Sequence, residues 1–380
     1  MADIMDSLKR RKLKVLHVLS SADIAGGERY VMDLIRSADA SFAHLVVLPY
    51  PGPFRHILSD INCSYCVVHM TRKFSARSVL SLVRCIKTNS IDIVHTHGYR
   101  ANFYGRIACT LAGTKCVSTV HVSLYDYTDT SFFARHIYMV VERLLSNRTD
   151  VFICISNAMK EDTLRLGIDP QKIVVIQNGV DLARFYPRAG REHLRKELGL
   201  TTKGPVVGTV GRMVTEKGQV HLVEALRHLK NEWKELKCLL VGEGPLLPQL
   251  KKMALDAGVA NMCIFPGIRK DIEFIYPLLD IFVLPSLREP FGLALLEAMA
   301  CGVPVIATAS GGPLGFVNPD VNGALVPPAN PELLASKISY WLLHRDKAQA
   351  IAAEGRKTVE REFSIKETVR RVEEVYRSPH

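Results

Sequence analysis

The sequence predicts an α/β protein made of two domains, each built on a parallel β-sheet, and three observations support this fold class. The 380 residues exceed one ordinary core and suit two domains of about 150–200 residues. Short apolar segments alternate with segments of helical periodicity from end to end, and this alternation specifies a parallel sheet covered on both faces. The alternation is interrupted near residues 180–204, where the sequence is polar and broken by Gly and Pro, and it then starts again.

The expected strands are short runs rich in Val and Ile, each followed by helix-like sequence. In the first half they lie at 14–20, 43–50, 92–98, 116–122 and 150–156. In the second half they lie at 206–212, 237–244, 263–268, 281–286 and 304–308. Residues 331–377 have an almost wholly helical pattern. We therefore expect domains at 14–185 and 200–362, followed by a last helix at 363–378.

The composition excludes several classes of protein. A hydrophobic content of 48% with 23% charged residues is ordinary for a globular protein. No apolar run reaches the roughly 18–20 residues of a membrane span, and no apolar stretch precedes the first charges, so we expect a cytoplasmic protein without a secretory signal. One close cysteine pair, Cys63 and Cys66, lacks the second pair that zinc requires, and two thiols of a reducing compartment are the simpler interpretation.

The charge is strongly basic, with a formal net charge of +11 and a basic run at residues 9–14. This balance suits an anionic membrane surface, a phosphorylated substrate or nucleic acid, whereas a solvated tail is the alternative for the run itself. The segment 131–148 mixes apolar residues such as Phe132, Phe133 and Tyr138 with Arg135 and Arg143. Such a helix either lies on an anionic bilayer or packs its apolar face on the first sheet.

The densest group of candidate site residues runs from Glu289 through Pro-Phe-Gly-Leu-Ala-Leu-Leu to Glu297. An expected strand ends shortly before Glu289, and Gly292 opens an expected helix. The free N–H groups at the start of that helix can bind a diphosphate. Glu297 lies about one and a half turns inside the helix, where its carboxylate can accept two hydrogen bonds from a ribose diol.

A second candidate follows the first strand of the second half. Arg212 and Lys217 lie in the loop that leads into the next helix, and two cations at one strand end can neutralise a departing nucleoside diphosphate. Ordinary surface cations are the alternative.

The first half offers weaker candidates at strand ends. Gly26 and Gly27 follow the first strand, where a plain tight turn would explain them equally well. His95, His97 and His121 lie near the ends of two further strands, and strand alternation puts His95 and His97 on the same face. A structural role is the alternative for each histidine.

Together, these segments resemble the retaining glycosyltransferases of family 4, which have the two-domain GT-B fold. The Glu-x7-Glu spacing of Glu289 and Glu297 carries the resemblance, with AGGER, DIVHTHG, STVHV, NGVDLARF, GRMVTEKG, LVGEGP and AMACGVPVIAT in the same order from about residue 14 to 376. The resemblance implies two Rossmann-like sheets that face a central cleft and a C-terminal helix that crosses back to the first domain. It implies transfer of a sugar, expected from a UDP-sugar, to a lipid-linked or saccharide acceptor, as in bacterial polysaccharide and lipopolysaccharide synthesis. The expected place is the cytoplasm, with peripheral attachment to the inner face of the cell membrane, and no nucleic-acid partner is expected.

The resemblance also assigns roles in donor binding. Arg212 and Lys217 would bind the diphosphate, Glu289 would hold the sugar, and Glu297 would hold the ribose. The remaining donor-binding positions lie on the second half of the chain and are Gly242, Ile268 on the base side, Phe291, Gly292 and Leu293.

In the first half, the resemblance places His121 near the transferred sugar and the loop of Gly26 and Gly27 near the phosphate and the acceptor. The family loop usually reads Gly-Gly-x-Glu, whereas this chain reads Ala25-Gly26-Gly27-Glu28.

The family normally needs no divalent metal, and the sequence contains no Asp-x-Asp pair to hold one. We therefore expect no metal and no other cofactor, with Arg212, Lys217 and the helix at Gly292 neutralising the leaving group. A sugar-nucleotide epimerase of the same fold and a non-catalytic nucleotide-sugar-binding scaffold are the alternatives. A nicotinamide-dependent oxidoreductase is disfavoured because Gly242-Glu-Gly244 lacks the third Gly of the dinucleotide fingerprint.

Overall fold

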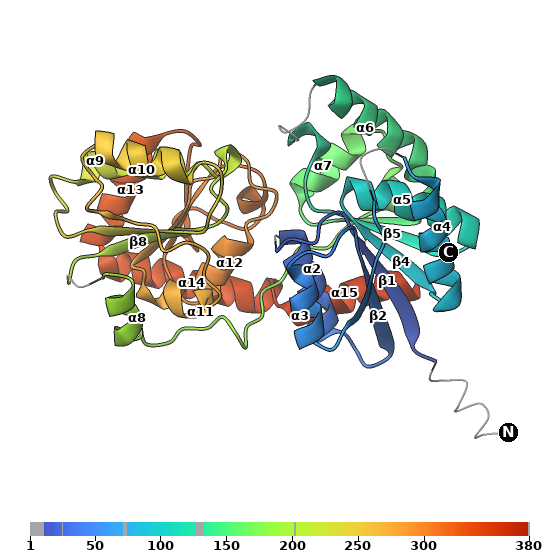
Figure 1. The fold of residues 1–380 in the computed structure, drawn as a ribbon. Coiled ribbons are helices and arrows are strands. Elements are labelled where there is room, and N and C mark those ends of the chain that lie inside the picture. Colours follow the sequence, from blue (N-terminus) through green and yellow to red (C-terminus); the bar gives the residue numbers. More distant parts are fainter. Residues whose placement is uncertain (1–10, 25, 71–73, 127–131, 201–202, 379–380) are drawn as a thin grey trace. The chain divides into compact units, whose positions relative to one another are not determined.

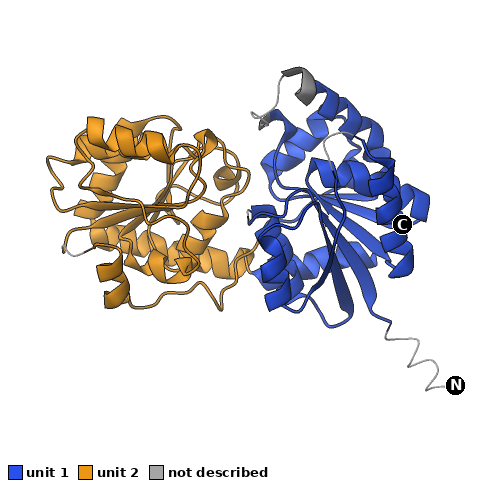
Figure 2. Ribbon diagram, viewed as in Figure 1, with its two compact units in different colours: residues 1–178, 365–380 blue, residues 179–364 orange. Residues whose placement is uncertain are grey.

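The chain forms two compact units, residues 1–178 with 365–380 and residues 179–364 (Figure 2). The computed structural model describes residues 11–24, 26–70, 74–126, 132–200 and 203–378. The boundaries between the units lie at 178/179 and 364/365, whereas the sequence predicts a joint between residues 185 and 200 and a last helix from residue 363. The two chain segments at these boundaries are neighbours, because Val180 forms a parallel bridge with Ser364 and its N–H donates to the carbonyl of Phe363 at 2.8 Å.

Unit 1 (residues 1–178 and 365–380) contains a seven-stranded sheet in the order β3-β2-β1-β4-β5-β6-β7, in which every pairing is parallel (Figure 1). The strands are β1 Leu13–Leu19, β2 Phe42–Leu48, β3 Ser64–Val67, β4 Ile93–His97, β5 Lys115–Val120, β6 Val151–Cys154 and β7 Ile173–Val175. The helices are α2 Gly26–Ser37, α3 Phe54–Asp60, α4 Ala76–Thr88, α5 Tyr99–Ala112, α6 Phe132–Leu145, α7 Asn157–Arg165 and α15 Ile365–Arg377.

The sheet of unit 1 buries apolar side chains on both faces, as expected for a parallel sheet whose two faces are covered by helices. On one face, Val15 and Leu19 pack in a core with residues of α2, α3 and α15. On the other face, Leu16 and Val18 pack with residues of α4 and α5. The last helix of the chain is therefore part of the core of unit 1, and the Thr368 hydroxyl fastens it by donating to the Gln177 carbonyl at 2.9 Å.

Unit 2 (residues 179–364) repeats this architecture with a six-stranded sheet in the order β10-β9-β8-β11-β12-β13, again parallel throughout. The strands are β8 Val206–Val210, β9 Lys237–Val241, β10 Cys263–Ile264, β11 Ile281–Leu284, β12 Val305–Thr308 and β13 Ala324–Val326. The helices are α8 Glu192–Glu197, α9 Gln219–Leu229, α10 Leu247–Asp256, α11 Ile272–Ile275, α12 Leu293–Ala300, α13 Pro331–Leu343 and α14 Arg345–Glu362.

The two parallel sheets predicted from the sequence are thus present, and each strand expected from an apolar run is found. The expected strands do not include β3, β7 and β13, because three or four residues are too short to show a periodicity. Among the helices of the described ranges, none combines the length and the apolar character needed to cross a membrane.

Candidate active site

Each sheet reverses its strand order next to its first strand, and a parallel sheet binds ligands at such a point, beyond the carboxyl ends of the strands. In unit 2 the reversal lies between β8 and β11, and in unit 1 it lies between β1 and β4. The segment from Gly211 to Gly218 follows β8, and the segment that contains Glu289 follows β11. The candidate residues of unit 2 therefore lie at the place where this fold binds ligands.

Lys217 and Glu289 form the central contact of the unit 2 site. The Lys217 ammonium lies 2.7 Å from Oε2 of Glu289, and the Ser286 hydroxyl donates to the same oxygen at 2.9 Å. The Glu289 side chain is 5% exposed, whereas that of Lys217 is 26% exposed. An ammonium has three N–H donors, so Lys217 can keep its contact with Glu289 and still bind an anionic ligand from the solvent side.

Glycines allow the loops at these strand ends to pack closely. A Cβ built on Gly311, which has a φ of 62°, would lie 2.1 Å from the carbonyl oxygen of Glu289. A Cβ on Gly218 would lie 2.1 Å from the carbonyl oxygen of Pro285. The loops after β12 and β8 are thereby held against the segment that carries Glu289, and its position is fixed on both sides.

The start of α12 lies directly after this segment. Gly292 is its N-cap residue and has a φ of 102°, which favours glycine. Phe291 is 3% exposed and packs against Phe316 and Phe363, so this residue can offer a ligand its backbone but not its ring. The N–H groups of the first turn, beginning at Leu293, lie next to Glu289 at the positive end of the helix dipole, where a helix can bind an anion.

Glu297 is buried within α12, and its carboxylate accepts a hydrogen bond from a buried tyrosine. The hydroxyl of Tyr276, whose side chain is fully buried, donates to Oε2 of Glu297 at 2.7 Å. The hydrogen bond compensates part of the cost of burying the carboxylate. It also fixes the orientation of the carboxylate.

The other donor-binding candidates of unit 2 lie in loops of the same sheet. Arg212 is exposed, and its carbonyl accepts a hydrogen bond from the Gln219 side chain at 2.8 Å. Gly242 packs so tightly that a Cβ there would lie 2.0 Å from the Gly211 carbonyl oxygen. Ile268 is 69% exposed, in the loop after β10. Gly242 is thus explained by loop packing, while Arg212 and Ile268 present side chains to solvent.

The candidates of unit 1 come together around His121. A Cβ built on Gly27 would lie 3.6 Å from Cδ2 of His121, so the start of α2 lies against the imidazole ring. Gly26 has open space around it, and Ala25 lies outside the described residues. Nε2 of His121 lies 3.1 Å from Nδ1 of His97. Burial lowers the pKa of His121 to about 4, so this ring is neutral at pH 7.

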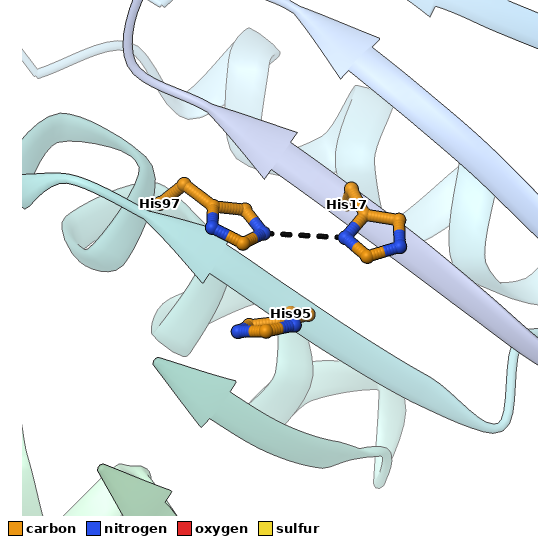
Figure 3. A group of neighbouring side chains, drawn as sticks. All are labelled: His17, His95 and His97. Atoms are coloured by element: carbon orange, nitrogen blue, oxygen red, sulfur yellow. Dashed lines mark hydrogen bonds between the residues drawn. The ribbon is translucent and has the colours of Figure 1, made fainter. Parts of the chain in front are cut away.

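His95 and His97 belong to a cluster of histidines in the sheet, with His17 on the neighbouring strand β1 (Figure 3). Within the part of the chain that the structure describes, these three form the group whose ligand atoms could hold a metal ion, since the atoms lie within 4.8 Å of one another. Burial lowers the pKa of all three rings well below the usual value. His95 already has partners for both ring nitrogens, the hydroxyls of Tyr376 and Thr119, each at 2.6 Å.

The sequence did not point to four residues that complete these groups: Ser286, Tyr276, His17 and His44. Ser286 and Tyr276 each bond a predicted glutamate. His17 was detectable in principle, because it is a polar residue on the same strand face as the buried Val15 and Leu19.

Comparison with known proteins identifies the family. A model described as Glycosyltransferase Family 4 matches residues 24–184, and one described as Glycosyl transferases group 1 matches residues 190–358. The chain is 32% identical over 326 residues to the UDP-Gal:alpha-D-GlcNAc-diphosphoundecaprenol alpha-1,3-galactosyltransferase of Escherichia coli, and the matched region covers 83% of this chain and 84% of that protein. The chain belongs to glycosyltransferase family 4.

Two further relatives agree with this assignment. The glycosyltransferase is 30% identical over 310 residues to the alpha-maltose-1-phosphate synthase of Mycolicibacterium smegmatis, covering 75% of this chain and 78% of that protein. It superimposes on the crystal structure of HepE from Anabaena, in complex with UDP and glucose, with a TM-score of 0.86 and 25% identity over 97% of this chain and all of that chain. The predicted GT-B fold and the predicted enzyme class, a retaining glycosyltransferase that uses a nucleotide sugar, are confirmed.

Proposed function

We propose that this enzyme transfers a sugar from a UDP-sugar to a lipid-linked acceptor in the synthesis of a bacterial polysaccharide or lipopolysaccharide. The ion pair between Lys217 and Glu289 at the end of β11 carries the proposal, because it places a cation for the diphosphate next to a carboxylate for the sugar. The bound UDP and glucose of HepE and the diphosphoundecaprenol-linked acceptor in the name of the Escherichia coli relative support the choice of donor and acceptor.

The proposed division of labour follows from the chemistry of each group. Lys217, Arg212 and the N-terminus of α12 neutralise the charge that develops on the departing diphosphate. Glu289 accepts hydrogen bonds from sugar hydroxyls, and Glu297 accepts them from the ribose. His121 contacts the transferred sugar from unit 1.

A panel of UDP-, GDP- and ADP-sugars tests the donor, with hydrolysis of the donor and thermal stabilisation as readouts. UDP-sugars should give both responses, and a response restricted to GDP- or ADP-sugars would overturn the choice of base. Conversion of the donor to its epimer without an acceptor would instead indicate an epimerase.

Two variants test the residues. Lys217→Ala and Arg212→Ala should each lower transfer by on the order of 10²-fold or more, because each removes charge stabilisation of the leaving group. Lys237→Ala is the matched control, since Lys237 lies at the N-terminal end of β9, away from the carboxyl ends of the strands, and its ammonium donates to the Asn261 carbonyl at 2.7 Å. Wild-type turnover in either test variant would contradict the assignment.

We further propose that transfer proceeds without a metal cofactor. The cations and helix terminus of unit 2 supply the positive charge that a metal would otherwise provide. The enzyme should retain most of its activity in excess EDTA. Complete loss of activity, restored by magnesium or manganese, would overturn this proposal.

Attachment to an anionic membrane surface is the proposed route to a lipid-linked acceptor. In α6, Ile137, Val140 and Leu144 follow one another at helical spacing and are 47%, 45% and 70% exposed. Arg143 is exposed beside them, while Glu142 faces inward and pairs with the buried Arg106 at 2.6 Å. Apolar side chains with neighbouring cations suit the interface of an anionic bilayer.

The basic run at the N-terminus supports this attachment less directly. Lys9 and Arg10 lie outside the described residues. Arg11 pairs with Asp92 at 2.9 Å, and the Lys14 ammonium donates to a carbonyl of unit 1 at 2.9 Å. Likewise, the side chains of Phe132, Phe133 and Arg135 are outside the described part of α6.

Liposome sedimentation tests the membrane proposal. The wild type should sediment with vesicles that contain anionic lipid, less so as salt rises, because exposed charges are screened over about 8–10 Å at physiological salt. The double variant Ile137→Ser with Leu144→Ser should weaken sedimentation. Leu111→Ser, which changes a side chain that is 57% exposed on α5, should not. A wild type that stays in the supernatant with anionic vesicles at low salt would refute attachment.

A further inference from the structure

Four histidine rings of unit 1 form a continuous row across the sheet. His44 Nδ1 lies 3.0 Å from His17 Nε2, His17 Nδ1 lies 3.2 Å from His97 Nε2, and His97 Nδ1 lies 3.1 Å from His121 Nε2. The rings belong to β2, β1, β4 and the residue that follows β5, which are neighbours in the sheet. Figure 3 shows the central contact, between His17 and His97 on adjacent strands. The row ends at His121, the candidate residue for contact with the sugar.

All four rings are neutral at pH 7. Burial lowers the pKa of His44 and of His121 to about 4. Burial, together with neighbouring imidazoles, lowers the pKa of His17 and His97 well below the usual value. A neutral imidazole carries one N–H donor and one bare nitrogen acceptor. Four protons are therefore distributed over eight ring nitrogens.

Counting these protons leaves two arrangements. Each of the three contacts needs one proton between its two nitrogens, and each ring supplies one proton. If His44 donates from Nδ1, then His17, His97 and His121 must in turn carry their protons on Nδ1. If His121 donates from Nε2, then His97, His17 and His44 must carry theirs on Nε2. Any mixed arrangement leaves at least one contact with two protons or with none.

We propose that the row is a tautomer relay, in which all four rings share one tautomer and thereby fix whether Nδ1 of His121 donates or accepts a hydrogen bond. His17, His44 and His97 are then positioning residues, which act on the substrate through His121. This proposal deepens the proposed function, because the relay determines whether His121 donates a hydrogen bond to a sugar hydroxyl or accepts one from it. Its kinetic consequence therefore rests on the proposed function.

His95 distinguishes the relay from a metal site. His95 is as buried as His17 and His97, and its ring centroid lies 4.2 Å from that of His97, yet its nitrogens bond Tyr376 and Thr119 rather than the row. A metal ion held by His17, His95 and His97 would need bare nitrogens where the relay holds a shared proton. The two assignments therefore exclude one another at the contact between His17 and His97.

Nuclear magnetic resonance of the full chain with ¹⁵N-labelled histidine tests the relay without any substrate. Ring nitrogen shifts identify the protonated nitrogen, and scalar coupling across an N–H···N hydrogen bond identifies its partner. We expect coupling across all three contacts, with the same ring nitrogen as donor in each. Different donors among the four rings, absence of coupling between them, or shifts of His17 and His97 that respond to added Zn²⁺ or to EDTA would overturn the relay.

Kinetics provide a second readout, with a matched control. His17→Leu interrupts the row and should lower kcat about five- to tenfold with little change in KM, the factor that corresponds to one net hydrogen bond. His17→Gln, whose amide offers one donor and one acceptor, should restore part of this loss. His95→Leu removes an equally buried ring but should leave the coupling between His97 and His121 intact.

A purely structural role would have a different signature: His17→Leu and His95→Leu would then lower the active fraction alike, and His17→Leu would leave the coupling between His97 and His121 and the kcat per folded enzyme unchanged. That result would overturn the relay. If no nucleotide sugar is turned over, the proposed function fails, while the spectra still decide the relay.

Discussion

The ion pair of Lys217 and Glu289 makes a quantitative prediction through a double-mutant cycle. Glu289→Gln and Lys217→Met each neutralise one partner and keep most of its volume. Lys217→Met leaves the Glu289 carboxylate, which is 5% exposed, with the Ser286 hydroxyl but without its cation. Glu289→Gln leaves the Lys217 ammonium facing an amide.

The expected magnitude follows from the burial of the two groups. Breaking a fully buried pair costs about 3–5 kcal/mol, but Lys217 is 26% exposed, so water compensates part of the loss and we expect about 1–3 kcal/mol for each single variant. For a unit of this size, about 1 kcal/mol corresponds to a Tm change of about 2–4 °C. The double variant should recover part of the loss, because no unpaired charge remains, and a coupling energy of about 1–2 kcal/mol is expected.

Urea unfolding of the four proteins measures the cycle, and calorimetry with the preferred nucleotide measures donor binding. Stability should recover in the double variant, whereas nucleotide binding should stay as weak as in Lys217→Met, because the cation for the diphosphate is absent from both. Losses of stability that add to within about 0.5 kcal/mol would show that the two side chains are not coupled and would refute the reasoning.

Three further predictions concern the surroundings of the site. Tyr276→Phe removes the hydroxyl that orients Glu297 through a charge-assisted hydrogen bond of about 1.5–3 kcal/mol. Calorimetry should show nucleotide binding weakened about ten- to hundredfold, and an unchanged affinity would show that Glu297 does not bind the ribose. Gly311→Ala would push a Cβ into the Glu289 carbonyl and should lower both the Tm and the affinity for the donor, whereas Gly315→Ala, at a position with open space, should change neither. Because the buried histidines have lowered pKa values, the unfolded state binds more protons than the folded state below about pH 6.5. The urea midpoint of unfolding should therefore fall as the pH drops from about 6.5 towards 4. A constant midpoint over this window would contradict their burial in neutral form.

The two-sheet architecture and the charged residues of the site could be predicted from the sequence, but the side chains that hydrogen-bond those charged residues could not. Alternation of strands and helices, the Glu-x7-Glu spacing and the cationic loop are local features that can be read from neighbouring residues. Tyr276 and Ser286 take part through contacts that depend on how separate segments pack, which no periodicity encodes. The end of β10 at Ile264 was also missed, because Pro266 lacks a backbone N–H and Gly267 has a φ of 73°, so this apolar run leaves the sheet early.

The histidine row shows the same limit. The sequence singles out His97 and His121 because they lie near strand ends, but His17 and His44 are separated from them by long stretches of chain. Only the strand order β2-β1-β4-β5 makes the four rings neighbours. A prediction of this row would have required the register of three strand pairings, which the sequence pattern does not determine.

The use of α15 in the core of unit 1 has a consequence for the synthesis of the protein. Ile365, Val369, Val372 and Tyr376 belong to the same apolar core as β1 and α2, but the ribosome makes them after the whole of residues 179–364. At about 5–20 residues per second, the nascent first unit waits on the order of 10–40 s for the helix that closes its core. During this interval the sheet face around His44 and Phe42, which α15 later covers, is open to solvent and to chaperones. A chain whose synthesis ends at about residue 364 therefore has all the residues of its second unit but lacks the last helix of its first unit.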